Sequence, residues 1–136
     1  LDSKPWTKGI LGGVIATDII YKQKFDEKNR IALIVLDSTI EIAFKEFLVK
    51  ESDHHYSDRE LLDIFSQRHK VETEVKKYNK GKKITKTDWK KIAHYYDIRC
   101  KLVHQRASIN IIDDDIKDYK KIVEKVTKIL FGLNFN

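Results

Sequence analysis

An arginine and a histidine, with four residues between them, stand near the end of a predicted helix in the stretch DIRCKLVHQRASIN. Arg99 offers a planar fork of donors that can hold a phosphate and stabilise charge developing on its oxygens. His104 can take up or release a proton near neutral pH. Together these two side chains are a candidate catalytic pair.

The spacing of the pair also allows a structural role. An offset of five residues places Arg99 and His104 about 140° apart on an ideal helix, so one straight helix does not present both to one phosphate. Either the helix loosens before His104, or a two-fold dimer brings both copies of each residue into one cleft. In the structural reading, Arg99 instead forms a salt bridge with Asp37 or Glu41, which share one side of an earlier helix.

That earlier helix is predicted to run from Asp26, a good N-cap residue, to Lys50, without Gly or Pro. Its apolar residues fall on two nearly opposite faces. One face holds Leu33, Leu36, Ile40, Phe44 and Phe47, and the other holds Ile31, Val35, Ile42 and Val49. We therefore expect neighbours to cover this helix on both sides.

The helix with the Arg/His pair is predicted to begin near Thr87 or Asp88. Spacings of four, three, four and three predict its packed face. The residues at these spacings are Trp89, Ala93, Tyr96, Cys100 and Val103. Cys100 is then a small buried filler rather than a nucleophile.

A final helix is predicted after the acidic turn at residues 113–115, which complements a helix dipole. It carries one apolar stripe and ends at Gly132. The stripe consists of Ile112, Ile116, Tyr119, Val123, Val126 and Leu130. A short helix is predicted over 14–24 after an irregular segment 1–13, and another begins at the Ser57 capping box. The predicted fold is all-α, an up-and-down bundle of four to five helices in a single domain, 1–136.

Over residues 26–135 the chain resembles the HEPN domains, helical bundles that carry an R-x(4–6)-H motif. The resemblance rests on the long helix IALIVLDSTIEIAFKEFL with its internal acids, a variable middle, the segment DIRCKLVH and the closing helix. Catalytic HEPN domains are metal-independent endoribonucleases that act as dimers. They use the RNA 2′-hydroxyl to attack the adjacent phosphate and leave a cyclic phosphate and a 5′-hydroxyl.

This resemblance implies a role for each residue of the site. Arg99 and His104 are the catalytic pair, with no metal and no cofactor. Supporting roles fall to Asp37, Glu41, Lys101 and Gln105. One departure is Cys100, which stands where catalytic members often carry Asn or another strongly polar residue.

Three readings of the function follow. The first is an RNA-cleaving homodimer, of the kind found in toxin or defence systems, with a neighbouring domain or a cognate inhibitor as partner. The second is a non-catalytic HEPN module that binds nucleotides or dimerises a larger protein. The third is a plain protein-interaction domain that uses the two apolar faces of the 26–50 helix.

Charge favours an anionic partner. The 136 residues carry a net charge of +6, and nine lysines lie between Lys70 and Lys91. Such a run is either a solvated face or a guide for an RNA backbone. The lysines predicted to bind RNA are Lys82, Lys83, Lys86 and Lys90.

Other features limit the class of protein. The apolar runs are too short to span a membrane, and a single cysteine fits a reducing compartment, so we predict the cytoplasm. The pair His54 and His55 lacks a third spaced ligand, so no metal site is predicted. The stretch GILGGVIA lacks the ending of a phosphate-binding loop. The chain contains no methionine, which favours either a domain of a longer protein or a processed product.

Overall fold

The computed structural model describes residues 4–104 and 109–135, and every regular element in these ranges is helical. A short 3-10 turn, Pro5–Thr7, precedes six α-helices. These are α1 (Lys8–Lys22), α2 (Lys28–Lys50), α3 (Asp58–Phe65), α4 (Arg68–Tyr78), α5 (Lys86–His104) and α6 (Asp113–Phe131). The predicted all-α class and the helical bundle are confirmed.

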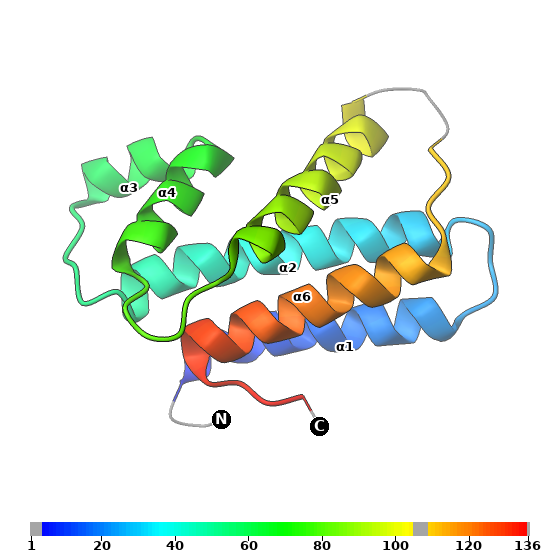
Figure 1. Cartoon of the computed structure of the whole chain (residues 1–136), viewed down its shortest axis with the longest axis horizontal. Helices are drawn as coiled ribbons and strands as arrows, with labels where there is room; N and C mark the ends of the chain where they lie inside the picture. The colour runs from blue at the N-terminus through cyan, green and yellow to red at the C-terminus, as the bar shows by residue number, and fades with distance from the viewer. Residues whose placement is uncertain (1–3, 105–108, 136) are drawn as a thin grey trace.

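Helix α2 lies at the centre of the bundle and packs against α1, α4, α5 and α6. In Figure 1, α1, α2 and α6 run side by side, α5 is inclined across them, and α3 and α4 lie together at one end. The predicted inner face of α2 is confirmed, since Leu33, Leu36 and Ile40 are fully buried. The buried apolar side chains form one continuous core around this face.

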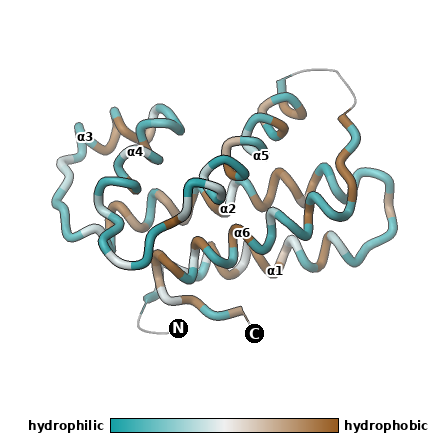
Figure 2. Tube along the Cα trace, in the orientation of Figure 1, coloured by the Kyte–Doolittle hydropathy of each residue, from teal (hydrophilic) through white to brown (hydrophobic). Residues whose placement is uncertain are grey.

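The distribution of hydrophilic and hydrophobic residues along the chain agrees with this helical arrangement. Figure 2 shows that the chain between α4 and α5, which carries part of the lysine run, is mostly hydrophilic. None of the helices within the described ranges has the length and apolar character needed to cross a bilayer.

The second apolar face of α2 is largely uncovered, so the prediction of packing on both sides is wrong. Ile42 and Val49 are more than two-fifths exposed. Ile31 and Val35, on the same predicted face, are half-buried, so neighbours cover only part of this side.

The predicted packed face of α5 is also wrong, because each packed position lies one residue earlier in the sequence than predicted. Ala93 is exposed and Val103 is half exposed, whereas Ile92 and Tyr95 are buried. The observed face has the same spacings of four and three but is rotated by about 100°. It consists of Asp88, Ile92, Tyr95, Arg99 and Leu102. Arg99 therefore faces the bundle interior.

The number of helices exceeds the predicted four to five, because α4 was not foreseen. Its signal is the spacing of Val71, Val75 and Tyr78, which was obscured by the surrounding lysines and glutamates. The first helix also begins earlier than predicted. Pro5 starts a helical turn, and α1 follows directly from Lys8, so segment 1–13 is helical from Pro5 on.

Helix α6 matches its prediction closely. Its apolar stripe is buried from Ile116 to Leu130, and Gly132 ends it in the left-handed conformation, with φ of 73°. Ile112 precedes the helix as its N-cap residue and is half exposed.

The α1–α2 contact depends on the absence of a side chain at Gly13. A Cβ there would collide with Thr39 Oγ1, and this hydroxyl is fixed by a 2.7 Å hydrogen bond to the Val35 carbonyl. Its neighbour Gly12 has nothing within 4 Å of the same position. Helices α1 and α2 are therefore in close contact at Gly13, whereas at Gly12 there is room for a side chain.

We expect Gly13→Ala to lower the free energy of unfolding by about 1–3 kcal/mol through overpacking, measured by urea denaturation. The control Gly12→Ala should raise stability by up to about 1 kcal/mol, because alanine favours helix and meets no clash. Thr39→Ala should relieve most of the Gly13→Ala defect. Equal effects of the two glycine substitutions would contradict the close contact.

Candidate functional site

The charged centre of the molecule is Asp37, in the middle of α2, with only 1% of its side chain exposed. Arg68 donates to both of its carboxylate oxygens, each at 3.1 Å, and the Tyr119 hydroxyl donates at 2.6 Å. Arg99 donates from Nε to Oδ2 at 3.1 Å. A carboxylate so deeply buried is tolerated because these donors replace the water it has lost.

Arg68 is the largest contributor to this network, and its role was not predicted from the sequence. Its side chain is 5% exposed and also contacts Glu72 at 2.8 Å and Glu41 at 3.3 Å. Burial alone lowers the pKa of Arg68, but the charge of Asp37 and the hydrogen bonds to it raise that pKa above its usual value. The guanidinium is therefore a permanent cation. The only signal in the sequence was the i, i+4 pair of Arg68 and Glu72.

Tyr119 anchors α6 to the same carboxylate. Burial raises the pKa of the Tyr119 hydroxyl well above its ordinary value, and the nearby charge of Asp37 raises it further. The hydroxyl thus keeps its proton and acts as a donor to Asp37. Its ring stacks on Tyr95 of α5, with ring centroids 4.6 Å apart, which links α6 to α5 beside the network.

Arg99 differs from Arg68 because it remains partly accessible. Its side chain is 25% exposed, and the guanidinium lies 5.1 Å from the Tyr96 ring centroid. Only Nε is hydrogen-bonded within the described part of the chain, so the two terminal nitrogens are available to a ligand. A pocket of about 80 Å³ lies beside it, lined by Ile34, Asp37, Ser38, Glu41 and Arg99.

The predicted pairing of Arg99 with Asp37 is therefore present in the structure, whereas a pairing with Glu41 is not. Glu41 contacts Arg68 and Lys45 instead, each at 3.3 Å. Around the pocket, the charges of Arg68, Arg99 and Lys45 balance those of Asp37, Glu41 and Glu72. An arriving phosphate thus meets a neutral site with one accessible guanidinium.

His104 is the last residue of α5 and is exposed. The helix runs unbroken from Arg99 to His104, so their directions differ by about 140°. The structure does not bring the two side chains together within one chain. Gln105 lies outside the described residues, and Lys101 is paired with Asp97 at 2.9 Å.

The predicted RNA-binding lysines lie toward the other end of α5. Lys82 and Lys83 are in the preceding loop, and Lys83 donates to the Asn79 carbonyl. Lys86 and Lys90 are exposed and share one face of α5 with Lys101 and His104, within about 60°. That face is about 27 Å long, so the lysines and His104 can touch different parts of one extended strand.

Of the two histidines before α3, His54 belongs to an aromatic cluster, and His55 is exposed. His54 stacks on Tyr78 at 4.7 Å and meets Tyr56 edge-on at 4.5 Å, between ring centroids. In residues 4–104 and 109–135, no group of three or more His, Cys, Asp or Glu side chains is placed to hold a metal ion.

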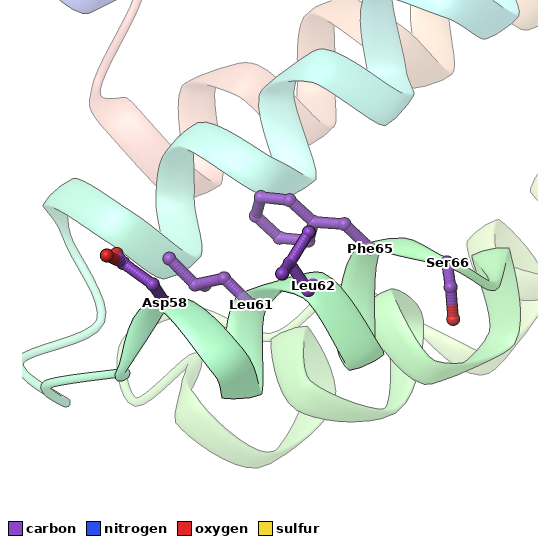
Figure 3. A pocket seen from close by; sticks show the side chains of 5 residues that line it. All are labelled: Asp58, Leu61, Leu62, Phe65 and Ser66. Atoms are coloured by element: carbon purple, nitrogen blue, oxygen red, sulfur yellow. The ribbon is translucent and has the colours of Figure 1, made fainter.

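A wide apolar pocket of about 600 Å³ lies along α3, as Figure 3 shows. It is lined by Asp58, Leu61, Leu62, Phe65 and Ser66. Leu62 is 76% exposed. This pocket offers apolar contact but no pairing of an acid, a base or a nucleophile, so the candidate site remains the pocket at Arg99.

We expect Asp37→Asn to lower the free energy of unfolding by about 3–5 kcal/mol, because it leaves the buried charge of Arg68 without its main partner. The measurement is urea denaturation followed by circular dichroism. Asp97→Asn is the matched control on a mostly exposed ion pair and should cost less than about 1 kcal/mol. Similar losses in the two variants would show that the Asp37 network does not stabilise the fold.

Comparison with known proteins adds no assignment. No protein-family model, no curated protein and no solved structure matches this chain. The likeness to HEPN domains therefore rests on the motif and on the order of the helices, and the function has to be argued from the geometry of Asp37, Arg99 and His104.

Proposed function

We propose that this chain is a metal-independent endoribonuclease of the HEPN type that cleaves single-stranded RNA. The observation that supports this most is the arrangement of Arg99. Asp37 holds its Nε, its terminal nitrogens make no hydrogen bond within the described residues, and its side chain lines a small pocket. A guanidinium oriented in advance loses little freedom when it binds a phosphate, and it keeps two donors for the charge that develops on the phosphate oxygens.

The proposed reaction is an internal transesterification. The RNA 2′-oxygen loses its proton to a neutral His104 imidazole and forms a bond to the adjacent phosphorus. The bond from phosphorus to the 5′-oxygen breaks, and that oxygen receives a proton from a protonated His104. The products are a 2′,3′-cyclic phosphate and a 5′-hydroxyl. Arg99 stabilises the added negative charge on the phosphate oxygens.

A second copy of the chain is part of this proposal. Arg99 faces the bundle interior and His104 faces solvent, so one copy does not direct both at the same phosphate. In a two-fold dimer, Arg99 of one copy and His104 of its partner meet in one cleft. Two half-exposed apolar side chains, Val103 and Ile112, lie next to His104 and at the start of α6. We assign them to the contact between copies.

A second candidate is a non-catalytic module that binds nucleotides or dimerises a larger protein. The observation that favours it is the neutral charge balance around Arg99, together with Cys100 in the position after the arginine. In this reading Arg99 acts as a structural partner of Asp37. The two candidates differ in whether RNA is cleaved or only bound.

We expect the wild-type chain to cleave end-labelled single-stranded RNA in excess EDTA and to leave cyclic-phosphate ends. Arg99→Ala and His104→Ala should each lower the rate by about 100-fold or more. General acid–base catalysis by His104 contributes about that factor, and so does stabilisation of developing charge by Arg99. The rate is measured from gel-resolved fragments, and the ends are identified by mass spectrometry.

His55→Ala and Arg59→Ala serve as matched controls, since both side chains are exposed and lie outside the candidate site and the lysine-bearing face of α5. Their rates should equal the wild-type rate. Cleavage that survives in His104→Ala would refute the catalytic role of that residue. Nucleotide binding by calorimetry, without any cleavage by the wild type, would favour the second candidate.

We also expect light scattering to give twice the 16.1 kDa chain mass for the wild type. Val103→Asp should give the monomer, because a charge buried in the proposed contact between copies would lack a partner. Leu62→Asp changes an even more exposed side chain on α3 and should leave the dimer intact. A monomeric wild type would contradict the composite site.

A further inference from the structure

We propose that a basic groove beside the end of α6 binds single-stranded RNA through its phosphates, at a place separate from Arg99 and His104. This α6 groove has a volume of about 400 Å³. It is lined by Lys82, Lys121, Glu124, Lys125, Lys128, Leu133, Asn134 and Phe135. The inference goes beyond the proposed cleavage, because the groove can bind RNA whether or not the chain cuts it.

The groove carries an excess of positive charge. Lys121, Lys125 and Lys128 repeat at spacings of four and three and so share one face of α6, where like charges repel. Lys125 is paired with Asp88 at 2.7 Å. Lys82, Lys121 and Lys128 have no carboxylate within 4.0 Å in the parts of the chain that the structure describes. An anion in the groove would remove this repulsion.

The wall opposite the lysines comes from the C-terminal segment. Gly132 takes the left-handed conformation and turns the chain back after α6. Leu133 is buried and anchors the segment, while Phe135 is half-buried and lines the groove. Lysines beside an aromatic ring are the combination that binds single strands, since the lysines hold phosphates and the ring stacks on a base. The aromatic ring therefore favours RNA over an acidic peptide.

The groove also lies close to the start of the lysine-bearing face of α5. The Lys125–Asp88 ion pair ties the first turn of α5 to α6. Asp88 faces the bundle, about 160° around α5 from Lys86 and Lys90, so a strand held in the groove reaches the lysine-bearing face by passing around the first turn of α5. His104 lies about 27 Å from Lys86 along that face. The groove thus offers an anchoring point for RNA at the end of α5 away from the candidate site.

The test measures binding of a fluorescein-labelled 12-nucleotide oligouridylate by anisotropy, in EDTA and in a His104→Ala background that prevents cleavage. The groove variant combines Lys82→Gln, Lys121→Gln and Lys128→Gln. The matched control combines Lys8→Gln, Lys22→Gln and Lys24→Gln, three exposed lysines of α1 and its following loop. Both variants lose the same total charge.

We expect the groove variant to bind at least about tenfold more weakly than the control variant. Its plot of log affinity against log salt concentration should be shallower by about 2, since each lost phosphate contact removes about 0.7 from the slope for a single strand. Phe135→Ala should weaken binding about fivefold or more without changing the slope, because it removes stacking and not charge.

Equal affinities and slopes for the groove and control variants would overturn the proposal. It would also be overturned if a 12-residue oligoglutamate bound as tightly as the RNA and Phe135→Ala had no effect, because the groove would then be a site for an acidic protein. Loss of binding in the groove variant, together with no cleavage by the wild type, would refute the nuclease proposal and leave the groove standing.

Discussion

The burial of one carboxylate in the centre of α2 governs how the other helices are placed. Asp37 is almost fully removed from water, and a charge in that position requires donors from its surroundings. Arg68 at the start of α4, Arg99 in α5 and Tyr119 in α6 supply them. Because each donor comes from a different helix, the ion network fixes α4, α5 and α6 around α2. Helix α1 has no part in this network and joins α2 by close packing at Gly13 and by a hydrogen bond from Lys28 to the Tyr21 carbonyl.

The same constraint shapes the candidate site. To reach Asp37, Arg99 has to face the bundle interior, and the regular helix then carries His104 to the solvent side. Asp37 fixes the orientation of Arg99, which remains accessible. Within one chain, however, Arg99 and His104 do not face the same phosphate. The proposed catalytic unit therefore spans two copies of the chain. The bound strand would extend along the lysine face of α5 from His104 toward the α6 groove.

Much of this architecture was predictable from periodicity and from residue chemistry. The inner face of α2 and the stripe of α6 followed from single, unambiguous patterns. Charge and position predicted that Arg99 pairs with Asp37 or Glu41, and only the structure distinguishes the two. The packed face of α5 was not predictable in this way, because the set that begins at Trp89 and the set that begins at Asp88 have the same spacings. The second set contains the charged residue Arg99, so the sequence favoured the first. The role of Arg68 and the α6 groove depend on segments that are distant in the sequence, so no local pattern predicts them. In the groove, for example, Lys82, Lys121 and Phe135 line one surface.

The composite site is the central claim, and mixing two inactive variants tests it most directly. Arg99→Ala and His104→Ala are combined, allowed to exchange subunits, and assayed for RNA cleavage in EDTA. If Arg99 of one copy works with His104 of its partner, the mixed dimer retains one intact site and activity returns to a substantial fraction of the wild-type rate. If both residues act from the same chain, the mixture stays as inactive as its components, and the account is contradicted.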